Sequence, residues 1–304
     1  MSESTHRATF GSALAYLDPA AALEWLEKAF GFEQTMVITD ESGKMVHSEM
    51  GFGDGYIMVG DEWAENIKAP ESVGGANTQH SSVHLPSGLD AHYERAKAAG
   101  ARITMEPNVQ PYGARVYLAV DIGGHEWDFS EPADVAADAM AQAGMKVEQH
   151  REGSVVRSFF PEALYRDAKA AVDWLTKAFG FETTMVIESD AGIRAHLAFQ
   201  DAEVAVGSEY VYEGRPSRLS PLSVGGGNTQ TIHIQLRTDI DAHCERARAA
   251  GAKIVQEPET QFYGDRTYRA VDPEGHMWTL AQTITVMAPE EWDAASGLTT
   301  KTSR

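Results

Sequence analysis

The segment YGDRTYRAVDPEGHMWTL at residues 263–280 is the most informative part of the sequence, because a second copy, YGARVYLAVDIGGHEWDF, is found at residues 112–129. Both copies place Tyr-Gly-x-Arg-x-Tyr before a run that ends in Ala-Val-Asp, followed by a turn and Gly-His-x-Trp. Proline and glycine at residues 272–275 supply the backbone angles of a tight turn. The alternation on each side of it predicts strands. The stretch therefore predicts a β-hairpin, and its repetition predicts two copies of one domain.

The repeat extends along most of the chain. AALEWLEKAFGFE matches AAVDWLTKAFGFE at an offset of 149 residues, SVGGANTQ matches SVGGGNTQ at 151, and His47 matches His196. Similarity of this length indicates tandem domains. We divide the 304 residues into a first domain at 1–132, a partly helical linker at 133–153, a second domain at 154–285 and a tail at 286–304. The tail begins with a possible short helix, and its last polar residues are expected to fray.

Within each copy, the same order of predicted strands and helices occurs twice. In the first copy a strand precedes a helix with Leu23, Leu26 and Phe30 at helical spacing, between the cap candidate Asp18 and the stop candidate Gly31. Three strands follow, and after a glycine-rich loop the same order returns. The chain is thus predicted to be α+β, with two βαβββ units in each domain. The sequence leaves open whether units pair within a domain or between domains.

Composition excludes several classes of function. The formal net charge of −20 argues against nucleic-acid binding, and it fits either solubility or a cationic ligand. No apolar run approaches the ~20 residues of a membrane span, and no secretory signal opens the chain. The single cysteine, Cys244, cannot form an intramolecular disulfide. We expect a cytoplasmic protein that is either a monomer with pseudo-dimeric domains or a homodimer.

AFGFE at the end of the first helix, and GDR followed by DPEGHMW at the end of the second copy, resemble the vicinal oxygen chelate superfamily. This superfamily includes glyoxalase I, bleomycin-resistance proteins, fosfomycin-modifying enzymes and extradiol dioxygenases. The resemblance implies curved eight-stranded mixed sheets whose concave faces bind small molecules. It does not fix the reaction, because function depends on the site and not on the fold.

Metal enzymes of the superfamily take ligands from four strand positions. Carried over to this sequence, these positions fall on or near Gly11, Glu62, Ser82, Asp128, Phe160, Glu209, His233 and Thr279. A catalytic metal generally has three or more protein ligands, and neither copy supplies that many. No metal or other cofactor is therefore expected, and Glu209 and His233 are the candidate ligands if one binds. The two copies also differ at these positions, which suggests two non-equivalent sites.

Histidine, aromatic and arginine side chains of both copies are the candidates for binding a ligand. They are His47, Trp63, Tyr112, Arg115, Trp127, His196, Tyr210, His233, Tyr263, Arg266 and Trp278. For the histidines a hydrogen-bonded core position is an equal alternative, core packing is favoured for Trp127 and Trp278, and carboxylate pairing is an alternative for the arginines. The catalytic candidates are His47, His196, His233 and Asp128.

Two functions follow from this resemblance. The first is metal-independent sequestration of a partly aromatic small molecule, as in bleomycin resistance, a form of antibiotic resistance. The alternative is an enzyme, namely a lyase, isomerase or ring-cleaving dioxygenase. It would depend on a metal held by His233, or would work without a metal through a histidine or Asp128 as base. Neither nucleic acid nor a membrane is an expected partner.

Overall fold

The computed structural model describes residues 8–151 and 157–303, and the predicted boundary between residues 153 and 154 lies outside them. The elements of the first repeat are β1 (Phe10–Ala15), α1 (Pro19–Phe30), β2 (Glu33–Thr39), β3 (Met45–Phe52), β4 (Gly55–Gly60), β5 (Gln79–His84), α2 (Leu89–Ala98), β6 (Arg102–Gln110), β7 (Ala114–Val120) and β8 (Glu126–Pro132). Those of the second are β10 (Phe159–Tyr165), α4 (Ala168–Phe179), β11 (Glu182–Ser189), β12 (Gly192–Phe199), β13 (Ala202–Ser208), β14 (Gln230–Gln235), α5 (Ile240–Ala249), β15 (Lys253–Thr260), β16 (Asp265–Val271) and β17 (Met277–Thr283). The predicted α+β class with βαβββ units is confirmed.

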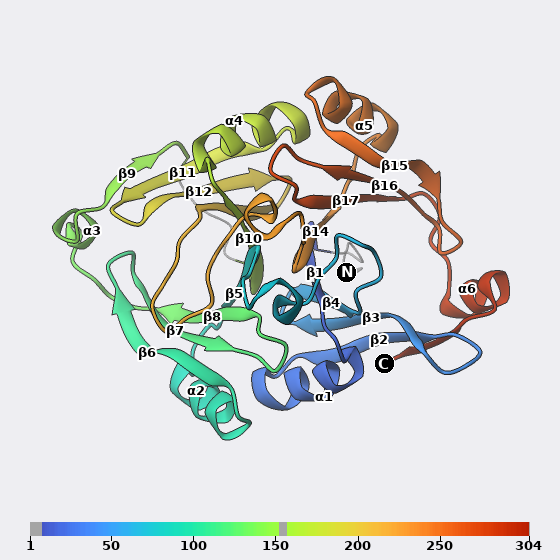
Figure 1. Ribbon diagram of the computed structural model, residues 1–304, viewed down its shortest axis with the longest axis horizontal. Coiled ribbons are helices and arrows are strands. Elements are labelled where there is room, and N and C mark those ends of the chain that lie inside the picture. The colour runs from blue at the N-terminus through green and yellow to red at the C-terminus, as the bar shows by residue number, and fades with distance from the viewer. Residues whose placement is uncertain (1–7, 152–156, 304) are drawn as a thin grey trace, which may run out of the picture.

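The units pair between the repeats, which the sequence left open. Sheet 1 has the order β15-β16-β17-β14-β1-β4-β3-β2-β18, and sheet 2 has the order β6-β7-β8-β5-β10-β13-β12-β11-β9. Strand β1 of the first repeat thus runs antiparallel to β14 of the second, and β5 runs antiparallel to β10. Each sheet therefore contains one unit from each repeat, and the two curved sheets lie side by side (Figure 1).

The linker and the tail each add a strand to a sheet edge. The linker contains α3 (Ala139–Gln142) and β9 (Lys146–Gln149), which pairs with β11. The tail contains α6 (Pro289–Ser296) and β18 (Thr299–Thr302), which pairs with β2. The prediction that the end of the tail frays is therefore wrong for these residues. The exposed edge of β2 offers unpaired backbone groups that a further strand can satisfy.

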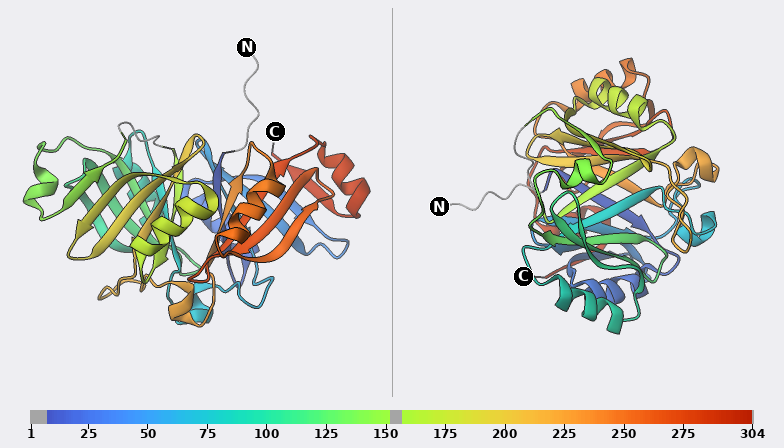
Figure 2. Two further views of the ribbon diagram at one scale, coloured as in Figure 1. Left: turned by 90° about the horizontal axis from the view of Figure 1, so that it is seen from above. Right: turned by 90° about the vertical axis from the view of Figure 1, so that its left-hand side faces the viewer.

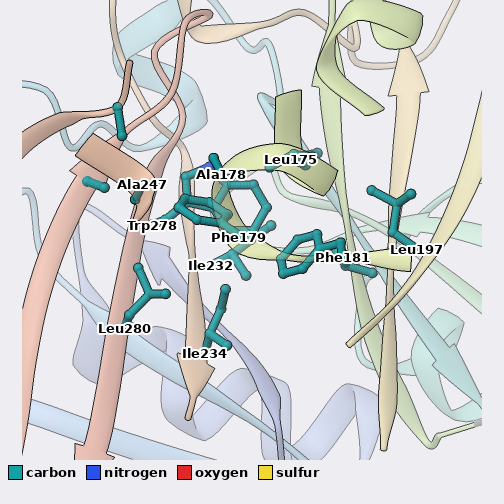
Figure 3. Packing of buried hydrophobic residues seen from close by; sticks show 14 of the residues in the cluster. Leu175, Ala178, Phe179, Phe181, Leu197, Ile232, Ile234, Ala247, Trp278 and Leu280 are labelled. Atoms are coloured by element: carbon teal, nitrogen blue, oxygen red, sulfur yellow. The ribbon is translucent and has the colours of Figure 1, made fainter. Parts of the chain in front are cut away.

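The hydrophobic cores, unlike the sheets, belong mainly to single repeats. One core joins α1 and α2 to strands of the first repeat, and the other joins α4 and α5 to strands of the second. Phe179, Phe181 and Trp278 lie in the second core (Figure 3). The two helix pairs cover opposite outer sides of the molecule (Figure 2). In the described part of the chain, no helix has the length and apolar character needed to cross a bilayer.

The Asn-Thr-Gln segments of the two repeats bond to each other where the units cross. The backbone N–H of Thr78 donates to Oγ1 of Thr229, and that of Thr229 donates to Oγ1 of Thr78, both at 3.0 Å. The side-chain amide of Gln79 donates to the backbone carbonyl of Gln230 at 2.7 Å. These reciprocal bonds place the two repeats around a pseudo-twofold axis. The glycine-rich loop and its Asn-Thr-Gln segment thus connect the units.

The repeated hairpin motif is structural. The carboxylate of Asp272 accepts hydrogen bonds from the Tyr165 hydroxyl at 2.6 Å and from the Trp278 indole at 3.1 Å. It also accepts the backbone N–H of His276 at 3.0 Å, and the His276 ring donates to the carbonyl of Leu164 at 2.7 Å. Asp121 has the same set of partners in the first repeat. The motif therefore ties the hairpin to the first strand of its own repeat.

Candidate functional site

The face of each sheet that the helices leave uncovered is here called its inner face. Along a strand successive side chains alternate between faces, so residues next to core residues belong to the inner face. On sheet 1 one row of paired residues crosses this face as Arg269, Thr279, His233 and Gly11. The corresponding row of sheet 2 is Leu118, Asp128, Ser82 and Phe160. The predicted ligand positions of three strands are thus brought together on each inner face.

The neighbouring row makes the two inner faces chemically different. On sheet 1 it contains Met277, Thr231, Ala13 and Met58. On sheet 2 the same positions hold Glu126, His80, Glu162 and Ala205. One face is therefore largely apolar where the other is charged. The predicted non-equivalence of the two sites is present in the structure.

Glu126 is the centre of the charged network on sheet 2. Its side chain is fully buried and accepts hydrogen bonds from Arg215 at 2.9 Å and from Arg218 at 3.0 Å. Burial alone would raise the pKa of Glu126, but the charges of Arg218, His80 and Arg215 lower it to about 2. The loop that follows β13 is thus tied to β8 by two ion pairs.

Asp128, a candidate base, lies beside this network. Its Oδ2 is 2.8 Å from Nε2 of His80 and accepts the Ser82 hydroxyl at 2.6 Å. Burial opposes ionisation, yet these hydrogen bonds and the charge of Arg194 hold the pKa of Asp128 well below its usual range. A general base works best with a pKa near the operating pH, so Asp128 is poorly suited to that role.

Glu162 contributes a third buried carboxylate to sheet 2. Its Oε1 lies 3.3 Å from Nε of Arg194, and its side chain is 4% exposed. A Cβ on Gly207 would stand 2.5 Å from the same oxygen, so the glycine makes room for the carboxylate. The Arg194 guanidinium also lies 5.8 Å from the centre of the Phe160 ring. Sheet 2 therefore pairs its carboxylates with its own cations.

Aromatic and histidine rings border the network of sheet 2. His84 stacks on Phe160 with ring centres 5.0 Å apart, and the His196 ring lies 5.9 Å from the same ring. Partial burial raises the pKa of Tyr112 to about 12, although 42% of the residue is exposed, and the charge of Asp128 adds to the rise. Of the predicted ligand-binding residues, Tyr112 and His196 thus belong to this side of the molecule, as does Tyr210.

Trp63 and Arg269 form the main feature of sheet 1. The Arg269 guanidinium lies 4.6 Å from the centre of the Trp63 ring, and Trp63 is 50% exposed. Burial lowers the pKa of Arg269, and the nearby Tyr263 partly offsets this. Tyr56 lies over Gly11, because a Cβ there would stand 2.4 Å from the Tyr56 ring. Aromatic rings and one cation therefore surround this row.

A histidine–carboxylate pair lies on the same inner face. Nε2 of His47 is 3.3 Å from Oε1 of Glu49, and the His47 side chain is 36% exposed. The sequence match paired His47 with His196, but the structure shows that they are not counterparts. Strand register places Glu49 at the position that His196 holds in sheet 2, since both pair with equivalent residues of β2 and β11. The longer turn between β2 and β3 accounts for the shift.

Four candidate ligand-binding residues lie away from the inner faces, in the core positions and carboxylate pairs that the sequence offered as alternatives. Trp127 and Trp278 are fully buried in the helix-covered cores, where apolar area favours them. Arg115 forms an ion pair with Asp90 of α2, and Arg266 pairs in the same way with α5. Their strands turn these side chains toward the helices and away from the inner faces.

The prediction that Glu209 and His233 could hold a metal together is wrong. His233 lies on β14 of sheet 1, whereas Glu209 follows β13 of sheet 2. Glu209 instead accepts the backbone N–H of Ser220 and the hydroxyl of Ser223, both at 2.6 Å. Because units pair between repeats, these two residues do not share an inner face. Among the residues at 8–151 and 157–303, no three His, Cys, Asp or Glu side chains gather as metal ligands.

Sequence reasoning missed Arg269, Arg194 and Glu162. All three differ from their counterparts in the other repeat, and such differences mark them as residues that the fold itself does not require. A difference between the repeats on a strand of the inner face is therefore the sequence signal that identifies such residues.

The comparisons with known proteins agree with this architecture. The family model for the Glyoxalase/Bleomycin resistance protein/Dioxygenase superfamily matches residues 11–129 and 161–280. The chain therefore belongs to this superfamily, with two tandem domains. Glyoxalase I from Zea mays superposes with a TM-score of 0.60 over 90% of this chain and 91% of its own, at 14% identity. That likeness concerns the fold alone.

Two curated relatives match less than half of the chain. An uncharacterized protein of Mycobacterium bovis is 33% identical over 137 residues, which are 44% of this chain and 89% of the relative. An uncharacterized protein of Mycobacterium tuberculosis is 33% identical over 137 residues, which are 79% of its length. These relatives assign no ligand or reaction.

Proposed function

We propose that this protein binds a small, partly aromatic molecule on the inner face of sheet 1 and sequesters it without a metal. The observation that carries the proposal is the half-exposed Trp63, which lies beside Arg269 next to a row of apolar side chains. Ligand sites in proteins combine apolar and aromatic walls with a few polar groups that fix orientation. The inner face of sheet 1 has this composition.

Sheet 2 supports the proposal by contrast. Its carboxylates already pair with arginines, as Glu126 does with Arg215 and Arg218. A ligand there would have to displace paired, buried charges, and an unpaired buried charge costs several kcal/mol, of order 3–5. A ligand beside Trp63 and Arg269 would displace no ion pair of Arg269 among the described residues. We therefore assign the ligand to one face only.

The His47–Glu49 pair is the observation that favours an enzyme as the second candidate. A histidine beside a carboxylate is a suitable general base, and this one is accessible on the inner face of sheet 1. Such an enzyme would move a proton within its bound ligand and would need no metal. Recovery of the ligand unchanged after long incubation separates sequestration from this alternative.

The test is a titration with the neutral dye N-phenyl-1-naphthylamine in the presence of a chelator. We expect one site per chain, with a rise in dye fluorescence. Trp63→Ala should weaken binding about tenfold, because an aromatic contact of this size is lost. Tyr210→Ala removes the corresponding aromatic ring beside sheet 2 and should leave the affinity unchanged. Equal affinities for wild type and Trp63→Ala, or loss of binding with chelator, would overturn the proposal.

A further inference from the structure

Arg269 differs from every other arginine in the described residues. Each of the others has a carboxylate oxygen within 4.0 Å or donates to a backbone carbonyl. Arg269 has neither type of partner within the part of the chain that the structure describes, and its guanidinium lies over the Trp63 ring. In a chain with 45 acidic residues, such a cation stands out.

The position of Arg269 points to a role in recognition. It lies on the inner face, paired with Thr279 in the row that continues to His233. Burial acts against its charge, since it lowers the pKa of the guanidinium. The contact with the Trp63 ring engages the positive charge but uses no oxygen acceptor. The N–H donors of the guanidinium are therefore left for an acceptor that the described residues do not supply.

From this geometry we infer that the ligand of sheet 1 is an aromatic carboxylate, whose anion pairs with Arg269 while its ring lies against Trp63. The inference rests on the proposed function. A guanidinium matches a carboxylate with two parallel N–H···O bonds, and such charged bonds are among the strongest in proteins. The anion would supply the oxygen acceptors that the surrounding residues do not.

The other inner face fits the same inference. Leu118 holds the position of Arg269 on sheet 2, and Asp128 holds that of Thr279. A carboxylate ligand placed there would find the described cations of that face already in use, because Arg194, Arg215 and Arg218 pair with buried carboxylates. Anion binding therefore belongs to sheet 1 alone, and one anion per chain is expected.

Calorimetric titration with a matched pair of probes, 2-naphthoate and 2-naphthamide, tests the inference. Both have the same aromatic ring, and only the first is an anion. Wild type should bind 2-naphthoate about tenfold more tightly than 2-naphthamide, because a charged hydrogen-bonded pair adds that much. Arg269→Gln should remove this preference and leave the affinity for 2-naphthamide nearly unchanged.

Arg266→Gln is the matched control. It removes the same charge from the same strand, but on the face that pairs with Asp241 of α5, so the preference should remain. Circular dichroism and thermal melting establish that each variant folds. Equal affinity for the two probes, or a preference that survives in Arg269→Gln, overturns the carboxylate assignment while leaving the proposed function standing. If neither probe binds, the carboxylate assignment and the proposed function are both overturned.

Discussion

His243 should make the stability of this protein fall in mild acid. Its Nδ1 accepts the hydroxyl of Tyr268 at 2.7 Å, and its Nε2 lies 3.1 Å from the carbonyl of Phe179, which can only accept. The neutral ring satisfies both bonds. Burial, with a smaller contribution from the charge of Arg246, lowers the pKa of His243 to about 4.

The size and sign of the effect follow from this pKa. An unfolded histidine has a pKa of about 6.5, so the folded state binds fewer protons between about pH 6.5 and 4. The contribution of His243 to stability is present above pH 6.5 and is lost as the pH falls through 4. At 1.36 kcal/mol for each pH unit, the full loss is about 3 kcal/mol.

Urea unfolding at pH 7.5 and pH 4.5 measures this loss. Wild type should lose about 2.5 kcal/mol more than His243→Gln between these two conditions, since glutamine can accept one bond and donate the other without titrating. His92→Gln, the counterpart in the first repeat, should act in the same direction, because burial also lowers the pKa of His92. If wild type and His243→Gln lose equal stability on acidification, the reasoning is refuted.

Three other changes test structural roles assigned above. Glu126→Gln should lower the free energy of unfolding by about 3 kcal/mol in urea titrations, because Arg215 and Arg218 then stay buried without their carboxylate. Asp272→Asn should cost about 2 kcal/mol, seen as a lower melting temperature, since an amide cannot accept all the bonds that the carboxylate accepts. Removing residues 287–304 uncovers the edge of β2, and size-exclusion chromatography should then detect self-association.

The sequence predicted what depends on local pattern. Helix α1 begins at the Asp18 cap, whose carboxylate accepts the N–H of Ala21, and it ends at Gly31 with a positive φ of 78°. These features depend on a few neighbouring residues, and they occur in both copies of the sequence repeat. The hairpins and the order of elements could be found in the same way. Secondary-structure propensity and the residues that favour turns determine these elements, and both depend on only a few neighbouring residues.

Pairing of units could not be predicted, because the two repeats resemble each other so closely. Strand β14 meets β1 through backbone bonds that any strand of suitable length could make. Nothing local distinguishes that partner from β10. The error over Glu209 and His233 followed directly from this ambiguity, since a candidate site drawn from one repeat is divided between two sheets.

The faces of strands were a second source of error. Trp278 alternates in phase with Leu280, which is buried under the helices, whereas Thr279 between them belongs to the inner face. Aromatic rings suit both a core and a ligand site, so residue type alone did not decide. An aromatic residue that lies an even number of positions from a buried aliphatic residue of the same strand is on the core face, and this rule does separate the two cases.

Comparison of the two inner faces separates what the fold needs from what each face has acquired. Sheet 1 carries Met277 and Ala13 where sheet 2 carries Glu126 and Glu162, in the same register. Buried ion pairs seldom stabilise more than apolar residues of similar volume. The fold therefore does not require the charges of sheet 2. Their local effect is to fasten the loop after β13 to β8, and this difference between the faces is the basis for proposing that the ligand binds to sheet 1.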